Sequence, residues 1–153
     1  MDWFLDLIGN SFLLTGLSSW FVAQVLKVII YAYINRELNW ERLFGDGGMP
    51  SGHSATVSSL AVFTGLRCGF DSAVFAIAAV FAIVVCHDAT GVRQETGKQA
   101  VVINEMIEYF SSLAERKFTH MELKEFVGHT PLQVAAGISI GIANALFMHF
   151  FVF

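Results

Sequence analysis

The chain has 153 residues, about the length of one domain, and 55% of its residues are hydrophobic while 14% are charged. A soluble domain carries roughly 25% charged residues, so this composition predicts a single domain, residues 1–153, that is embedded in a membrane. The net charge of −4 is spread along the chain without a basic or acidic block, which leaves no electrostatic reason to expect a nucleic-acid partner.

Four apolar segments are candidates for membrane helices, which need about 20 mostly apolar residues. The N-terminal segment before them has acidic residues and no basic one, whereas a secretory signal begins with a basic region, so we expect no cleavable signal. We predict an all-α integral membrane bundle with about four transmembrane helices. The four segments are residues 11–34, 54–69, 72–85 and 131–153.

Lys27 lies deep in the first apolar segment. An ammonium group inside a membrane is unfavourable unless it faces a partner or a cavity, so Lys27 is a candidate functional residue. The alternative is a side chain that extends toward the nearer membrane surface.

A polar loop, GGMPSGHSA at residues 47–55, comes immediately before the second apolar segment. Glycines let a backbone turn tightly or approach a ligand, and Pro50 suits the first turn of a helix. The unpaired N–H groups and the positive dipole end of such a helix favour an anion such as phosphate. Ser51 adds a hydroxyl donor, and His53 adds a group that titrates near neutrality. The alternative is an ordinary helix cap with an incidental histidine.

The third apolar segment ends in CHDATGVRQETGKQA, residues 86–100, which supplies Asp88, Arg93 and Lys98. His87 and Asp88 point about 100° apart on a helix, and no second carboxylate follows at ligand spacing, so a metal pair is disfavoured. We expect Asp88 to pair with Arg93 or Lys98.

The next 40 or so residues are polar but patterned. Apolar side chains recur at helical spacing, as in an amphipathic helix, and we expect this helix to lie at the membrane surface. They are Val102, Met106, Ile107, Phe110 and Leu113. Thr119 and Glu122 form a capping box for a second, short helix that Gly128 would end. The alternative for both segments is an ordered loop.

The fourth apolar segment opens with GHTPLQVAAGISIG, residues 128–141, which contains His129. Thr130 and Gln133 form a capping box with proline at the first helical position. Gln133 also follows His129 by four residues, so the two side chains share a helix face and can form a hydrogen bond.

The distribution of basic residues predicts the orientation. Seven of the nine follow the first or the third crossing, and Arg67 lies on the opposite side. We therefore expect both polar regions to lie in the cytoplasm or an equivalent compartment, in a bacterial plasma membrane or an organelle membrane. The seven are Arg36, Arg42, Arg93, Lys98, Arg116, Lys117 and Lys124.

With this topology, the three polar blocks emerge on one membrane face, where two histidines, a helix start and at least two cations suggest a phosphate site. PSGH followed by a hydrophobic helix, together with HTPLQVAAGISIG, resembles the type 2 phosphatidic acid phosphatase superfamily, whose fold vanadium haloperoxidases also use. The three blocks in this order are similar to its small divergent branch of membrane proteins. The likeness extends from about Gln24 to Gly141.

The resemblance implies a role for each matching residue. His129 would be the nucleophile that forms a phosphohistidine, and His53 the general acid. Ser51, Gly52 and nearby backbone amides would hold phosphate oxygens, while the cationic side chains would neutralise their charge. These cations are Lys27, Arg93 and Lys98. No metal or other cofactor is expected.

The sequence departs from the superfamily pattern in three places. Arg36 follows Lys27 after eight residues instead of six and precedes glutamate, not proline, so Arg36 is a poor candidate. Arg93 precedes His129 by 36 positions instead of six, so it can serve only if the intervening segment loops out. Gln133 stands where the superfamily has a carboxylate that orients the histidine, which predicts some loss of activity.

We therefore expect a metal-independent membrane phosphatase that hydrolyses a lipid phosphomonoester, of phosphatidic acid or phosphatidylglycerophosphate type, or an isoprenyl pyrophosphate. The alternative is a catalytically weak or inactive phosphate- or lipid-binding membrane protein with an assembly or regulatory role. A small transporter is a third possibility. Small residues at four-residue spacing, which let a second helix approach closely, also predict a homodimer. They are Gly137, Gly141 and Ala145.

Overall fold

The computed structural model describes residues 2–38, 48–113, 123 and 128–153, and every regular element among them is helical. The all-α fold is therefore confirmed. In chain order the elements are α1 (Asp2–Ile8), α2 (Ser11–Asn35), α3 (Gly52–Cys68), α4 (Ala73–Thr90), α5 (Val92–Leu113), α6 (Pro131–Phe147) and a π-helical turn, η2 (Met148–Val152).

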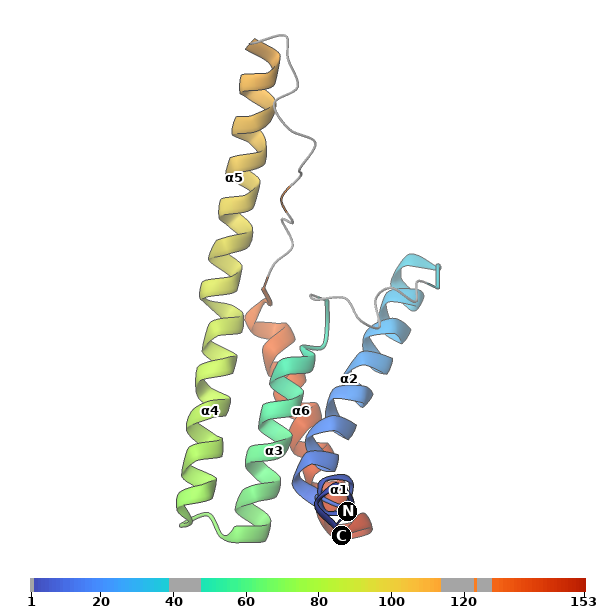
Figure 1. The fold of residues 1–153 in the computed structure, drawn as a ribbon. Coiled ribbons are helices and arrows are strands. Elements are labelled where there is room, and N and C mark those ends of the chain that lie inside the picture. Colours follow the sequence, from blue (N-terminus) through green and yellow to red (C-terminus); the bar gives the residue numbers. More distant parts are fainter. Residues whose placement is uncertain (1, 39–47, 114–122, 124–127) are drawn as a thin grey trace.

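Three described stretches are long and apolar enough to cross a membrane. They are Ser11–Asn35, Ala73–Leu113, which joins α4 and α5, and Pro131–Val152, which joins α6 and η2. The remaining predicted crossing, the second in the chain at residues 54–69, corresponds to α3, which has 17 residues and is about 25 Å long. It runs between α2, α4 and α6, and its first residues lie below the upper end of α2 (Figure 1). The protein is thus a membrane helical bundle with a short helix at its centre.

Glycine allows α6 to lie directly against α3. A Cβ atom on Gly141 would lie 2.9 Å from the backbone nitrogen of Ser59, and one on Gly137 would lie 3.1 Å from Cβ of Ser54. Both glycines and Ala145 are buried in this contact. The prediction that these residues form a dimer interface was therefore wrong, because their small size serves packing within the chain. A homodimer stays a prediction without that support.

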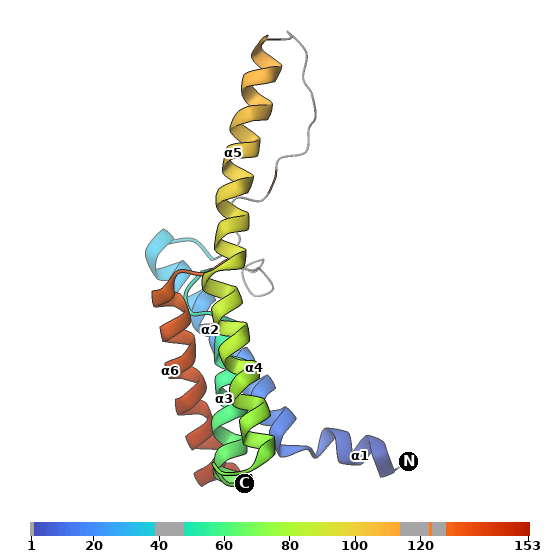
Figure 2. The same cartoon turned by 90° about the vertical axis from the view of Figure 1, so that its left-hand side faces the viewer.

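The amphipathic helix predicted after the third crossing is α5, but its direction differs from the expectation. It continues from α4 along nearly the same line and projects past the bundle (Figures 1 and 2). Helical hydrogen bonds carry the chain through Gly91, whose N–H donates to the His87 carbonyl at 2.8 Å and whose carbonyl accepts from Glu95 at 3.0 Å. Thr119 and Glu122, which predicted a second short helix, lie outside the described residues.

The N-terminal α1 was not predicted as a separate helix. It is set at a steep angle to α2, at the end of the bundle opposite α5 (Figure 2). Asn10 marks the change of direction, since its side chain accepts from the N–H groups of Phe12 and Leu13 at 3.0 and 3.2 Å and so caps α2.

Candidate active site

Backbone hydrogen bonds join the three sequence blocks at one end of the bundle. The Ser51 N–H at the start of α3 donates to the carbonyl of Gln133 in α6 at 3.0 Å. The His129 N–H donates to the carbonyl of Ala89 near the end of α4 at 2.9 Å. Segments 51–53, 86–93 and 128–133 are therefore neighbours, although the bonded residues Ser51 and Gln133 are 82 positions apart in the sequence.

Gly128 closes the long segment between Arg93 and His129. Its φ of +94° lies in the left-handed region, and a Cβ atom there would lie 2.7 Å from the Arg93 carbonyl carbon and 2.5 Å from the Gln94 nitrogen. Any side chain would thus collide with the start of α5. Glycine at this position lets the chain return directly onto the helix that carries Arg93.

Gln133 determines the protonation pattern of His129. Its side-chain oxygen accepts from the Thr130 N–H at 3.0 Å and lies 3.2 Å from Nδ1 of His129. The Thr130 N–H can only donate, so the amide atom between the two groups is the oxygen; an amide oxygen can only accept, so Nδ1 of His129 carries the proton. In the neutral imidazole, Nε2 therefore keeps its lone pair. The predicted capping box is also present, because Thr130 Oγ1 accepts from the Gln133 N–H at 3.4 Å.

The surroundings of His129 favour its neutral form. The side chain is 6% exposed, and this burial is the main cause that lowers the pKa of His129 below 6.5. The hydrogen bond with Gln133 opposes the shift, while the positive charges of Lys27, His53 and Arg93 add to it. These three groups come from α2, α3 and α5, so cationic residues from three helices act on one imidazole.

Lys27 is 5% exposed on α2, so its side chain is buried. Gly48 lies against its aliphatic part, since a Cβ atom on Gly48 would be 3.5 Å from both Cγ and Cδ of the lysine. Gly48, three residues before Ser51, therefore lies against the lysine side chain.

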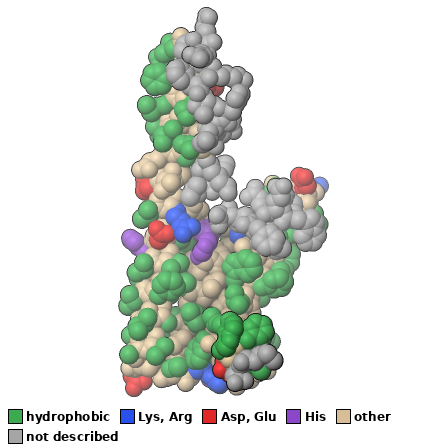
Figure 3. Space-filling view, viewed as in Figure 1, with side chains coloured by type: hydrophobic (Ala, Val, Ile, Leu, Met, Phe, Trp, Pro, Cys, Tyr) green, Lys and Arg blue, Asp and Glu red, His purple; other side chains and the backbone are tan. Residues whose placement is uncertain are grey.

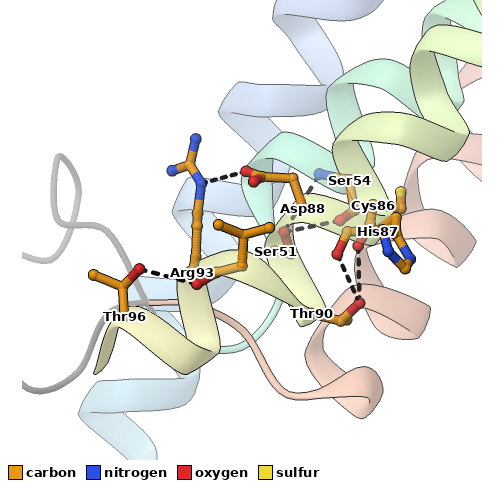
Figure 4. Close-up of polar contacts among 9 residues, drawn as sticks. Ser51, Ser54, Cys86, His87, Asp88, Thr90, Arg93 and Thr96 are labelled. Carbon is orange, nitrogen blue, oxygen red and sulfur yellow. Dashed lines mark hydrogen bonds and ion pairs between the residues drawn. The ribbon is translucent and has the colours of Figure 1, made fainter. Parts of the chain in front are cut away.

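Asp88 pairs with Arg93, as one of the two expected alternatives, through a 2.7 Å bond to Nε (Figure 4). The other two guanidinium nitrogens point away from Asp88 in this view. Lys98 lies farther along α5, is largely exposed and pairs with Glu95 at 2.6 Å. The charge of Arg93 acts on His129, so Arg93 lies near it. The position of Lys98 gives no support to a role as phosphate ligand.

The start of α3 has a buried side and an exposed side. Ser51 is fully buried, and its Oγ accepts from the Ser54 N–H at 3.3 Å and lies 3.0 Å from the Ser54 hydroxyl (Figure 4). Ser51 therefore acts as the helix cap, and its contact with phosphate stays a prediction. Gly52 is the first helical residue, and the next residue, His53, is exposed.

Charged and histidine side chains form a band across the visible face of the molecule, above a surface that is mostly hydrophobic (Figure 3). The band lies near the junction of α4 and α5. Such a boundary is where a lipid headgroup would meet the apolar surface of a membrane bundle.

Sequence reasoning gave no role to Gln24, which is as deeply buried as Lys27. A signal was present, because Gln24 is a polar residue in an apolar segment and precedes Lys27 by three positions, on the same face of the helix.

Comparisons with known proteins match the sequence that contains the three blocks. A family model described as "Divergent PAP2 family" matches residues 8–144, a span that contains all of them. The chain is 38% identical over 156 residues to a protein of Bacillus subtilis (strain 168) named "Uncharacterized membrane protein YuiD", with 96% of this chain and 99% of that protein covered. No solved structure matches the chain.

Proposed function

Because this chain belongs to the Divergent PAP2 family, we propose that it is an integral membrane phosphatase that hydrolyses a lipid phosphate through a phosphohistidine. One observation carries the proposal: Gln133 and Thr130 leave Nε2 of His129 unprotonated in a group of cationic side chains. A neutral imidazole nitrogen is a nucleophile, and clustered positive charge is what phosphoryl transfer requires.

In the first step, the Nε2 lone pair of His129 forms a bond to phosphorus while the bond from phosphorus to the lipid oxygen breaks. His53, in its cationic form, gives its proton to that oxygen, and the lipid alcohol leaves. In the second step, a water molecule gives a proton to His53 and attacks phosphorus. The nitrogen–phosphorus bond breaks, which releases phosphate and returns His129 to its neutral form.

Three groups are suited to bind the phosphoryl oxygens. Lys27 and Arg93 supply positive charge from opposite sides of the bundle, and both act on His129. The first turn of α3, which starts at Gly52, supplies backbone N–H groups and the positive end of the helix dipole.

The placement of the site favours a lipid substrate. It lies at the end of a bundle whose outer surface is hydrophobic, so a phosphate headgroup can enter while its chains remain in the bilayer. Phosphatidic acid, phosphatidylglycerophosphate and isoprenyl pyrophosphate each combine a phosphate headgroup with apolar chains. The distribution of basic residues supports a cytoplasmic location for this end.

Phosphate release by the purified protein from each of these three lipids tests the proposal. His129→Ala should lower turnover by about three orders of magnitude or more, because it removes the nucleophile. His53→Ala should lower turnover by about 10²- to 10⁴-fold, the usual contribution of a general acid. His87→Ala, which changes an exposed histidine at the end of α4, is the matched control and should leave turnover unchanged. If all three variants hydrolyse the lipids as fast as the natural protein does, the proposal is wrong.

A second candidate function is supported by Gln133 itself. When His129 becomes cationic, an amide offers it no negative charge, and in serine proteases the exchange of the carboxylate beside the catalytic histidine for an amide lowers turnover by roughly four orders of magnitude. The protein would then bind lipid phosphate and turn it over weakly or not at all, in an assembly or regulatory role. Phosphate binding without turnover, in both the natural protein and Gln133→Glu, would favour this second function.

A further inference from the structure

Gln24 is a buried polar side chain whose oxygen has no hydrogen-bond partner among the described residues. The residue is 6% exposed and lies in a helix that is long and apolar enough to cross a membrane. The interior of a bilayer offers no water as a hydrogen-bond partner, so an unpaired carbonyl group there is unfavourable. Buried polar side chains in membrane helices therefore usually pair with other protein groups.

Another amide in the bundle, that of Asn144, has hydrogen-bond partners. Asn144 of α6 lies within hydrogen-bond distance of the Thr15 carbonyl, the Ser18 hydroxyl and the Ser59 hydroxyl, at 3.1, 3.0 and 3.2 Å. This amide links α6 to α2 and α3. Besides Gln24 Oε1, one other buried side-chain atom of the described residues lacks a partner: Nδ1 of His149, in η2.

Gln24 lies between two of the groups that are suited to bind phosphate. It precedes Lys27 by three residues, so the two side chains lie on one face of α2, one turn apart. Its carboxamide carbon is 3.9 Å from the position that a Cβ atom would take on Gly52, the first residue of α3.

We propose that Gln24 is a further ligand of the phosphoryl group and binds it through its carboxamide, beside Lys27 and the start of α3. This inference rests on the proposed function. Rotation of the amide by 180° about its last bond exchanges oxygen and NH₂ with little change in shape, so the position now held by the unpaired oxygen can present a donor to an anion. Glutamine suits this place better than glutamate, because it adds no negative charge beside the phosphate.

The test measures binding of inorganic phosphate and of orthovanadate by calorimetry, on purified protein in detergent. Gln24→Met keeps the length of the side chain without its polar atoms and should weaken binding of both anions by about ten- to hundred-fold, as for a hydrogen bond to a charged group. Gln24→Glu should weaken binding further by repulsion. In the absence of anion, the melting temperature of Gln24→Met should not fall, because the substitution removes an unpaired buried group.

Two controls separate the possible failures. Asn144→Leu breaks a satisfied buried amide, so it should lower the melting temperature and leave anion affinity unchanged. Lys27→Met should weaken binding whether or not Gln24 contributes. If the natural protein and Gln24→Met bind equally while Lys27→Met does not, the inference on Gln24 is wrong and the proposed site remains. If the natural protein binds neither anion, both fail.

Discussion

Gln133 determines which nitrogen of His129 keeps its lone pair. Its oxygen is held by the Thr130 N–H, so it accepts from Nδ1 of His129 and leaves Nε2 unprotonated, as the proposed mechanism requires of a nucleophile. An amide orients the ring as a carboxylate would, but it adds no negative charge. The pKa of His129 therefore lies below 6.5, where burial and three cationic neighbours hold it.

This pKa predicts the acidic side of the pH profile. His129 attacks in its neutral form, so kcat/KM should fall only as the pH drops through a pKa lower than 6.5. Gln133→Glu places a carboxylate beside the ring, which favours the cationic form and should move this acidic limb to higher pH. The measurement is kcat/KM against pH for both proteins. An acidic limb that stays in place would show that His129 does not control it.

At the scale of the elements, the close contact of α3 and α6 holds the site together. The Ser51 N–H bonds to the Gln133 carbonyl at the site end of this contact, and Gly137 and Gly141 let the two helices approach below it. The positions of the cap at Ser51 and of the His129–Gln133 pair therefore depend on two small residues that are buried between α3 and α6.

Gly137→Ala should lower the free energy of unfolding by about 1–3 kcal/mol, because the added methyl group overlaps the Ser51 carbonyl and part of Ser54. Gly16→Ala is the matched control: a Cβ atom there would lie 3.7 Å from Cγ2 of Thr56, an ordinary contact. This control should be neutral, or stabilising by up to about 1 kcal/mol, since alanine is the better helix former. Equal unfolding free energies for the two variants in mixed micelles would contradict the packing account.

The same substitution separates packing from assembly. Gly137, Gly141 and Ala145 are buried within one molecule. Gly137→Ala should therefore change stability without changing the mass measured by sedimentation in detergent. If the natural protein is a dimer and this variant is a monomer, these small residues contribute to the contact between two molecules after all.

At the scale of the whole molecule, the site and α5 lie at one end of the bundle, and Cys68 and Arg67 lie at the other, where α3 ends. This arrangement makes the orientation testable by labelling of thiols in intact cells. The distribution of basic residues predicts that the site end faces the cytoplasm.

In a Cys86→Ser background, a membrane-impermeant maleimide should label Cys68, which is exposed, from outside. A cysteine placed at Glu108, exposed on α5, in a Cys68→Ser background should react only after the membrane is opened. The reverse pattern would place the site on the outer face. The paired variants control for differences in thiol reactivity, since each is measured before and after permeabilisation.

Local patterns in the sequence predicted the helical elements well. The extents of the apolar segments and the capping box of Thr130 and Gln133 depend on residues within one or two turns, so the sequence alone determined them. The start of α3 was predicted less well: Ser51 is its cap and Gly52 its first residue, so Pro50 lies before the helix and not in its first turn. The direction of α5 was not predicted, because helical bonds through Gly91 extend α4 where a break had been expected.

The tertiary structure decided the contacts between residues that are distant in the chain. The return of Gly128 onto the start of α5, the burial of Lys27 under Gly48, the packing of Gly137 against α3 and the unpaired amide of Gln24 each depend on the path of the whole backbone. A periodic pattern records which face of a helix is apolar and not which helix covers it. The sequence therefore determined which residues could form a phosphate site, and only the packing of the helices decided which of them lie around His129.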